Sequence, residues 1–222
     1  MSIGFQGYTA GAVKSDGWSV SINEFKASGQ PITLGSLFKP NEPISEILST
    51  LCFQSLTSLT NESSLEILEK ATEPRESSFK DFSLSKKGIL FDFDLSKIGG
   101  SDGYGTAEAL IPYSKLREFL KPEFVPKTVQ PLTEAPLNST NLAEQLAIIR
   151  IASYSNWMSL NTDDAHAYRQ RGVWYKRINR PSAADADFAR AKELESANDI
   201  SSPPATTTTT TTTTEGDPQK SE

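Results

Sequence analysis

The stretch "AYRQRGVWYKRINRPSAADADFARA", residues 167–191, decides the fold of the C-terminal part of this chain. Small and aromatic residues recur in it at helical spacing, before and after a break at Asn179, Arg180 and Pro181. The positions expected to pack against one another are Tyr168, Gly172, Tyr175, Ala184, Phe188 and Ala191. A glycine lets a second helix approach closely, and an aromatic ring fills the remaining space. The sequence therefore predicts two antiparallel helices over residues 163–195.

This pattern resembles a tetratricopeptide repeat, a helix–turn–helix unit of about 34 residues. The six packing positions match the repeat in register, whereas Arg171 stands where the repeat usually has leucine and Ser196 where proline often ends it. One repeat cannot bury its own face. We therefore expect this one to pack on a helix at residues 140–160, on the N-terminal domain, or on another chain.

A basic face is predicted on the first helix of the pair. The residues that share it are Arg169, Val173, Lys176, Arg177 and Arg180. In arrays of such repeats the first helix lines the surface that binds peptides, so the resemblance implies a site for an acidic peptide or a C-terminal carboxylate. The alternative is a solvated face that is partly neutralised by Asp185, Asp187 and Glu193. Trp174 is expected either to cover helix 140–160 or to stand exposed.

The N-terminal part alternates between strand and helix patterns. The expected strands cover residues 18–22, 32–34, 82–84, 89–95 and 107–111, and the expected helices cover residues 44–59, 64–71 and 115–120. Ile89, Phe91 and Phe93 alternate with Leu90, Asp92 and Asp94, and this period of two is typical of a strand. Ser114 is expected to cap the last helix. This order of elements predicts an α+β domain with a mainly antiparallel sheet, followed by the C-terminal helical hairpin.

Four regions follow from these patterns. An α+β domain covers residues 1–121, and a proline-rich linker covers residues 122–139. A helical region covers residues 140–198, with Thr140 expected to cap its first helix. Residues 199–222 include an uninterrupted threonine run and are expected to be a disordered tail.

Two N-terminal segments resemble a domain of unknown function. They are "GYTAGAVKSDGWSVSINEFKASGQPITLGSLFKP" (7–40) and "GILFDFDLSKIGGSDGYGTAEALIPYSKLREFL" (88–120). The domain occurs in lysozyme-sensing anti-sigma factors (RsiV type) and in peptidoglycan deacetylases (PdaC type). The matching positions are Tyr8, Gly11, Ala12, Gly29, Ile32, Leu34, Leu37, Phe38, Ile111, Pro112 and Tyr113, while Val13 replaces the usual histidine. The resemblance implies binding of a cell-wall component or a lysozyme-like enzyme.

The composition of the chain argues against a catalytic function and against nucleic-acid binding. The net charge is -6 at pH 7, and a dedicated nucleic-acid binder needs clustered positive charge. The chain has one cysteine and one histidine, which excludes multi-cysteine and multi-histidine metal sites. We expect Cys52 in the core, His166 on the surface, and Asp92, Asp94 and Asp102 solvated rather than bound to calcium. The expected function is non-catalytic binding of a protein or acidic peptide, without cofactor or metal.

The N-terminus has no apolar run typical of a signal peptide, and no segment reaches the length of a membrane span. As written, the sequence predicts a soluble, cytoplasmic protein. The relatives implied by the N-terminal resemblance are extracytoplasmic, so the alternative is a bacterial envelope-associated protein whose start lies further upstream with an export signal.

Overall fold

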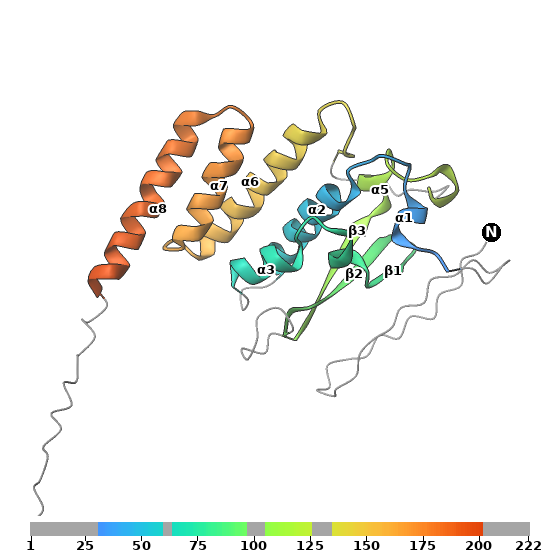
Figure 1. Ribbon diagram of the computed structural model, residues 1–222, viewed down its shortest axis with the longest axis horizontal. Coiled ribbons are helices and arrows are strands. Elements are labelled where there is room, and N and C mark those ends of the chain that lie inside the picture. Colours follow the sequence, from blue (N-terminus) through green and yellow to red (C-terminus); the bar gives the residue numbers. More distant parts are fainter. Residues whose placement is uncertain (1–30, 60–63, 97–104, 126–134, 202–222) are drawn as a thin grey trace, which may run out of the picture.

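The computed structural model describes residues 31–59, 64–96, 105–125 and 135–201. It has an antiparallel sheet with helices packed on it, followed by a C-terminal helical region, as the sequence predicts. Figure 1 shows α2 lying between the sheet and α6, with α6, α7 and α8 side by side. The expected strand at residues 18–22, Asp102 and the threonine run lie outside the described residues.

The sheet has three strands in the order β1 (Phe82–Leu84), β2 (Gly88–Asp94) and β3 (Thr106–Pro112). Phe91 pairs with Phe82 on one side and Ala109 on the other. The predicted alternation of β2 is confirmed, because its apolar residues are buried against the helices. Gly88 is required at the start of β2, since a Cβ atom there would lie 2.1 Å from the Ile111 carbonyl oxygen.

Two predicted helices of the N-terminal part are confirmed. They are α2 (Ile44–Leu59) and α3 (Leu65–Ala71), and a short 3-10 helix, η1 (Glu76–Phe79), follows them. Ser64 caps α3 by accepting a hydrogen bond from the Ile67 amide at 3.3 Å. The burial of Cys52 in α2 agrees with its predicted place in the core.

The predicted strand at residues 32–34 is wrong, because α1 (Leu34–Leu37) begins there. Leu34 and Leu37 are both buried. Positions three apart lie on one face of a helix but on opposite faces of a strand, so only the helix places both in the core.

The predicted helix at residues 115–120 begins earlier and is shorter than expected. It is α5 (Tyr113–Leu116), with Pro112 in the cap position and no side-chain cap. Ser114 lies inside the helix and is buried, so it is not the cap. The chain then turns back, and Leu120 forms a bridge with Phe38. A second 3-10 helix, η3 (Pro122–Phe124), follows.

The C-terminal helices are α6 (Leu142–Leu160), α7 (Ala165–Arg177) and α8 (Pro181–Ser201). The predicted helix pair is therefore confirmed, with Asn179 in the left-handed conformation (φ 55°) at its turn. Thr140 is not the cap of α6, because Asn141 occupies that position without a side-chain cap bond. Asp164 caps α7 by accepting a hydrogen bond from the Ala167 amide at 3.0 Å.

One cluster of buried side chains runs from Ile32 to Ala167. The rings of Phe53 on α2 and Tyr154 on α6 lie 5.1 Å apart between centroids and join the two parts of the chain. Leu137, within the predicted linker, is also buried in this cluster. The sequence left three surfaces on which the helix pair could pack, and in the structure α7 packs on α6. Trp174, on α7, packs against the same core. Among the described residues, no helix is long and apolar enough to cross a membrane.

Candidate functional site

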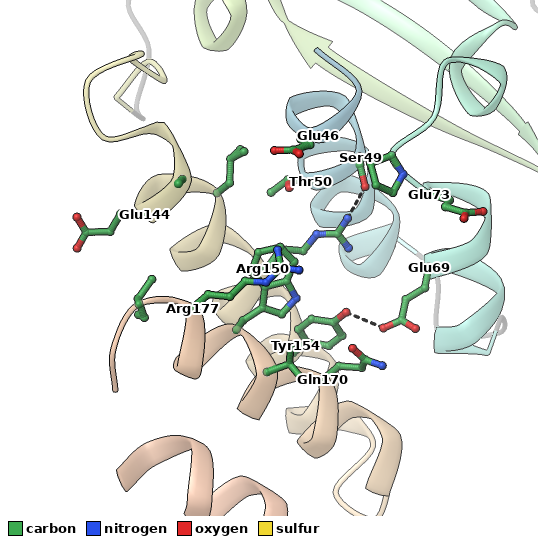
Figure 2. Close-up of a pocket in the computed structure, with 16 residues that line it drawn as sticks. Glu46, Ser49, Thr50, Glu69, Glu73, Glu144, Arg150, Tyr154, Gln170 and Arg177 are labelled. Atoms are coloured by element: carbon green, nitrogen blue, oxygen red, sulfur yellow. Dashed lines mark hydrogen bonds between the residues drawn. The ribbon is translucent and has the colours of Figure 1, made fainter. Parts of the chain in front are cut away.

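A cleft of about 940 Å³ opens between the N-terminal helices and α7. Its floor is α6, one wall comes from α2 with the end of α3, and the other wall comes from α7 (Figure 2). We call it the α6 cleft. It lies where the segments before and after the predicted linker meet, a common position for binding sites.

Arg150 lies at the centre of the α6 cleft. It stands four residues from Leu146 and from Tyr154, so it belongs to the buried stripe of α6 that faces α2. Only 7% of the residue is exposed. Its Nη2 donates a hydrogen bond to Ser49 Oγ at 2.6 Å. Its guanidinium lies 4.2 Å from the Phe53 ring centroid.

The charge of Arg150 has no direct counterion in the part of the chain that the structure describes. No carboxylate there lies within ion-pair distance of its guanidinium, and its buried Nε has no hydrogen-bond partner. Loss of hydration on burial lowers the pKa of Arg150, and the nearby Tyr154 and Glu69 offset only part of this lowering. The ring of Trp174, on α7, lies 5.8 Å from the guanidinium carbon. Aromatic rings thus flank the guanidinium, while part of its hydrogen-bonding capacity is unused.

A second polar group lies below Arg150, where Glu69 connects three helices. The Tyr154 hydroxyl donates to Glu69 Oε1 at 2.6 Å, and His166 Nε2 lies 2.8 Å from Glu69 Oε2. The hydrogen bond with Glu69 raises the pKa of His166, and burial raises the pKa of Tyr154. His166 is half-buried and bonded, so the expectation of a simple surface histidine is wrong.

The rim of the α6 cleft is mainly acidic. Glu46 and Glu144 are exposed, and Glu73 pairs with Arg75 at 3.1 Å. Arg177 lies over the Trp174 ring, 4.2 Å from a ring centroid. Counting Glu69 and Arg150, four carboxylates and two guanidinium groups line the cleft.

The residues of the predicted basic face lie on different surfaces of the structure. Val173 and Arg177 line the α6 cleft. Arg169 instead pairs with Glu195 on α8, and Lys176 Nζ lies 4.7 Å from the Phe188 ring centroid. Arg180 is exposed at the turn between α7 and α8. Of the four predicted cations, Arg177 therefore lines the α6 cleft, and Arg169, Lys176 and Arg180 do not.

The packing residues of the helix pair lie where the sequence places them. Ala184 and Ala191 are buried. A Cβ atom on Gly172 would lie 2.8 Å from Phe188 Cε1, which explains why this position has no side chain. Tyr168 and Tyr175 flank Arg171, with ring centroids 5.8 Å and 5.7 Å from its guanidinium carbon.

Arg171 makes an internal ion pair where the repeat usually has leucine. Its Nη2 lies 2.7 Å from Asp187 Oδ1, and its Nη1 donates to Ser155 Oγ at 3.0 Å. Asp187 is buried, so it does not neutralise a solvated basic face as the alternative interpretation assumed. Glu193 is paired with Arg190 at 3.1 Å, on its own helix. The Arg171–Asp187 pair ties α6, α7 and α8 together.

No metal site is found among the residues that the structure describes. Asp92 and Asp94 lie on the partly exposed face of the sheet. Burial, together with Glu108 and Asp81, raises the pKa of Asp92. Burial also raises the pKa of Cys52, which keeps its thiol protonated.

Comparison of this chain with known proteins gives no match to a family model, a curated protein or a solved structure.

Proposed function

We propose that this chain is a non-catalytic binding protein that takes up a carboxylate-bearing segment of a partner in the α6 cleft. The segment is an acidic side chain or a C-terminal carboxylate of a peptide. The observation that carries the proposal is the buried guanidinium of Arg150, which has no carboxylate within ion-pair distance and one unpartnered donor.

The energetics of a buried cation favour such a ligand. Moving a charged group out of water costs on the order of several kcal/mol per ion, unless a counterion and hydrogen bonds offset this cost. Ser49 and the Phe53 ring supply part of the offset. A carboxylate that accepts from the guanidinium edge would supply the rest through charge-assisted hydrogen bonds. The rings of Phe53 and Trp174 lie close to the guanidinium carbon without offering a hydrogen-bond acceptor in the ring plane, and a planar carboxylate matches the fork of guanidinium donors.

The proposal keeps the acidic peptide expected from the sequence and changes where it binds. Val173 and Arg177 belong both to the predicted basic face and to the α6 cleft. The resemblance to a tetratricopeptide repeat agrees with a peptide-binding role for α7. Binding of a cell-wall component or lysozyme-like enzyme, which the resemblance to RsiV-type proteins implies, stays a prediction from residues 7–40 and 88–120.

The proposal is tested by peptide selection on the full chain. A peptide library with free C-termini is passed over the immobilised protein, and retained peptides are measured by mass spectrometry. We expect retention of carboxylate-bearing peptides, and a loss of at least about tenfold in affinity with Arg150→Met. Arg117→Met is the matched control, because Arg117 is exposed and outside the cleft. No retention by the wild type, or equal retention by Arg150→Met, would refute the proposal.

Two further variants separate the cleft from the rest of the basic face. Arg177→Met should weaken binding several-fold, because Arg177 lines the α6 cleft. Arg169→Met should leave binding within about twofold, because Arg169 is paired with α8 and exposed pairs contribute little. The opposite order of effects would place the ligand on the α7–α8 surface instead.

A further inference from the structure

The charges around Arg150 restrict the class of ligand. A purely anionic ligand such as phosphate would meet four carboxylates and two guanidinium groups in the α6 cleft. Glu73 is paired with Arg75 and Glu69 is bonded to Tyr154 and His166, but Glu46 and Glu144 would still repel a purely anionic ligand. A ligand with both an anionic and a cationic group would instead find a partner for each.

The cationic end of such a ligand has a candidate partner in Glu46. Glu46 is exposed, lines the cleft, and makes no ion pair with any residue that the structure describes. Figure 2 shows its side chain extending from α2 beside the opening above Arg150. Its place in the first turn of α2 is favoured by the helix dipole, which accounts for a carboxylate there. The same position also places this carboxylate on the cleft that Arg150 lines.

The separation of the two partners follows from helix geometry. The contacts Ser49–Arg150 and Phe53–Tyr154 advance by four residues on both helices, so α2 and α6 run in the same direction. Glu46 stands three residues before Ser49, which is a rise of about 5 Å along α2. With the reach of both side chains added, the charged groups suit a span of roughly 7–10 Å, the length of two or three extended residues.

We infer that the ligand of the α6 cleft is a short zwitterionic peptide, with its C-terminal carboxylate on Arg150 and its free α-ammonium group on Glu46. This inference depends on the proposed function and narrows it to one class of ligand. The cleft volume of about 940 Å³ accommodates a peptide of two or three residues.

The test is a calorimetric titration of the full chain with trialanine. The matched ligands are N-acetyl trialanine, trialanine amide, the doubly blocked peptide and inorganic phosphate. We expect saturable binding of trialanine, at least about tenfold weaker binding of each singly blocked form, and none of the doubly blocked form or phosphate.

The variant Glu46→Gln tests whether Glu46 binds the α-ammonium group of the peptide. This variant should bind trialanine as weakly as the wild type binds the N-acetyl form, and its binding of the N-acetyl form should be unchanged. Glu123→Gln is the control, because Glu123 is exposed and outside the cleft. Circular dichroism should show both variants folded, since each changes one exposed side chain.

The outcomes separate the two claims. If N-acetyl trialanine binds as tightly as trialanine, and Arg150→Met abolishes both, the zwitterionic ligand is refuted while the carboxylate site stands. If trialanine does not bind, the inference is refuted, and the peptide selection described above decides the proposed function independently. Binding of phosphate in place of peptide would refute both.

Discussion

Replacing Arg150 with methionine should leave the protein as stable as before, or more stable. The change removes the hydrogen bond to Ser49, which contributes about 1.5–3 kcal/mol, and the cation–π contact with Phe53, which contributes about 2 kcal/mol. It also removes two costs. Burial of a guanidinium without a counterion costs on the order of several kcal/mol, and burial of an Nε without a hydrogen-bond partner costs about 1–3 kcal/mol. Methionine has a similar length and packs well against aromatic rings.

These opposing contributions predict a net change between about zero and a gain of about 2 kcal/mol in the free energy of unfolding. Urea denaturation of the wild type and of Arg150→Met measures it, and each kcal/mol corresponds to about 2–4 °C in Tm for a chain of this size. Arg117→Met should leave stability unchanged and serves as the control.

A loss above about 3 kcal/mol would refute the reasoning, because that is the cost of breaking a buried ion pair. Arg150 would then be a structural cation whose charge is already balanced within the fold. If Arg150→Met keeps its stability but loses peptide binding, the role of Arg150 is ligand binding rather than stabilisation of the fold.

Three further predictions concern the helical region. Asp187→Asn should cost about 3 kcal/mol in urea denaturation because it leaves Arg171 without its buried partner, and replacing both by apolar residues should recover most of the loss. Gly172→Leu should cost more than about 3 kcal/mol in the same assay, or unfold the helix pair, because Phe188 occupies the space next to the glycine; a neutral effect would contradict the packing. The pKa of His166 is raised above its usual 6.5 by its bond to the carboxylate on α3, so its contribution to stability is complete below that pH and is lost as pH rises through the raised pKa. Urea denaturation at acidic and alkaline pH should show this loss in the wild type and not in His166→Gln.

Much of the secondary structure could be predicted because its signals are local. The alternation of Ile89, Phe91 and Phe93 predicted a strand, and Gly172 opposite Phe188 predicted two closely packed helices. Boundaries were less predictable. No strand forms at residues 32–34, and a helix begins at Leu34 instead, because Leu34 and Leu37 are both buried in the core, which local alternation does not predict.

The candidate site was harder to predict. The basic residues of α7 stand out in the sequence, yet Arg169 and Lys176 lie against α8 rather than in a cleft. Arg150 carries a weaker signal: it is a cation within the apolar stripe between Leu146 and Tyr154. That spacing could have identified it as buried, but not what faces it.

The period of apolar residues was enough to predict the α+β class, the helix pair after the proline-rich segment, and the packing between Gly172 and Phe188. The burial of Arg150 beside Ser49, with the rings of Phe53 and Trp174 on either side, became known from the packing of the whole chain. Those residues come from α2, α6 and α7. A helical period shows which face of each helix is buried, whereas the partner of that face depends on how the whole chain packs.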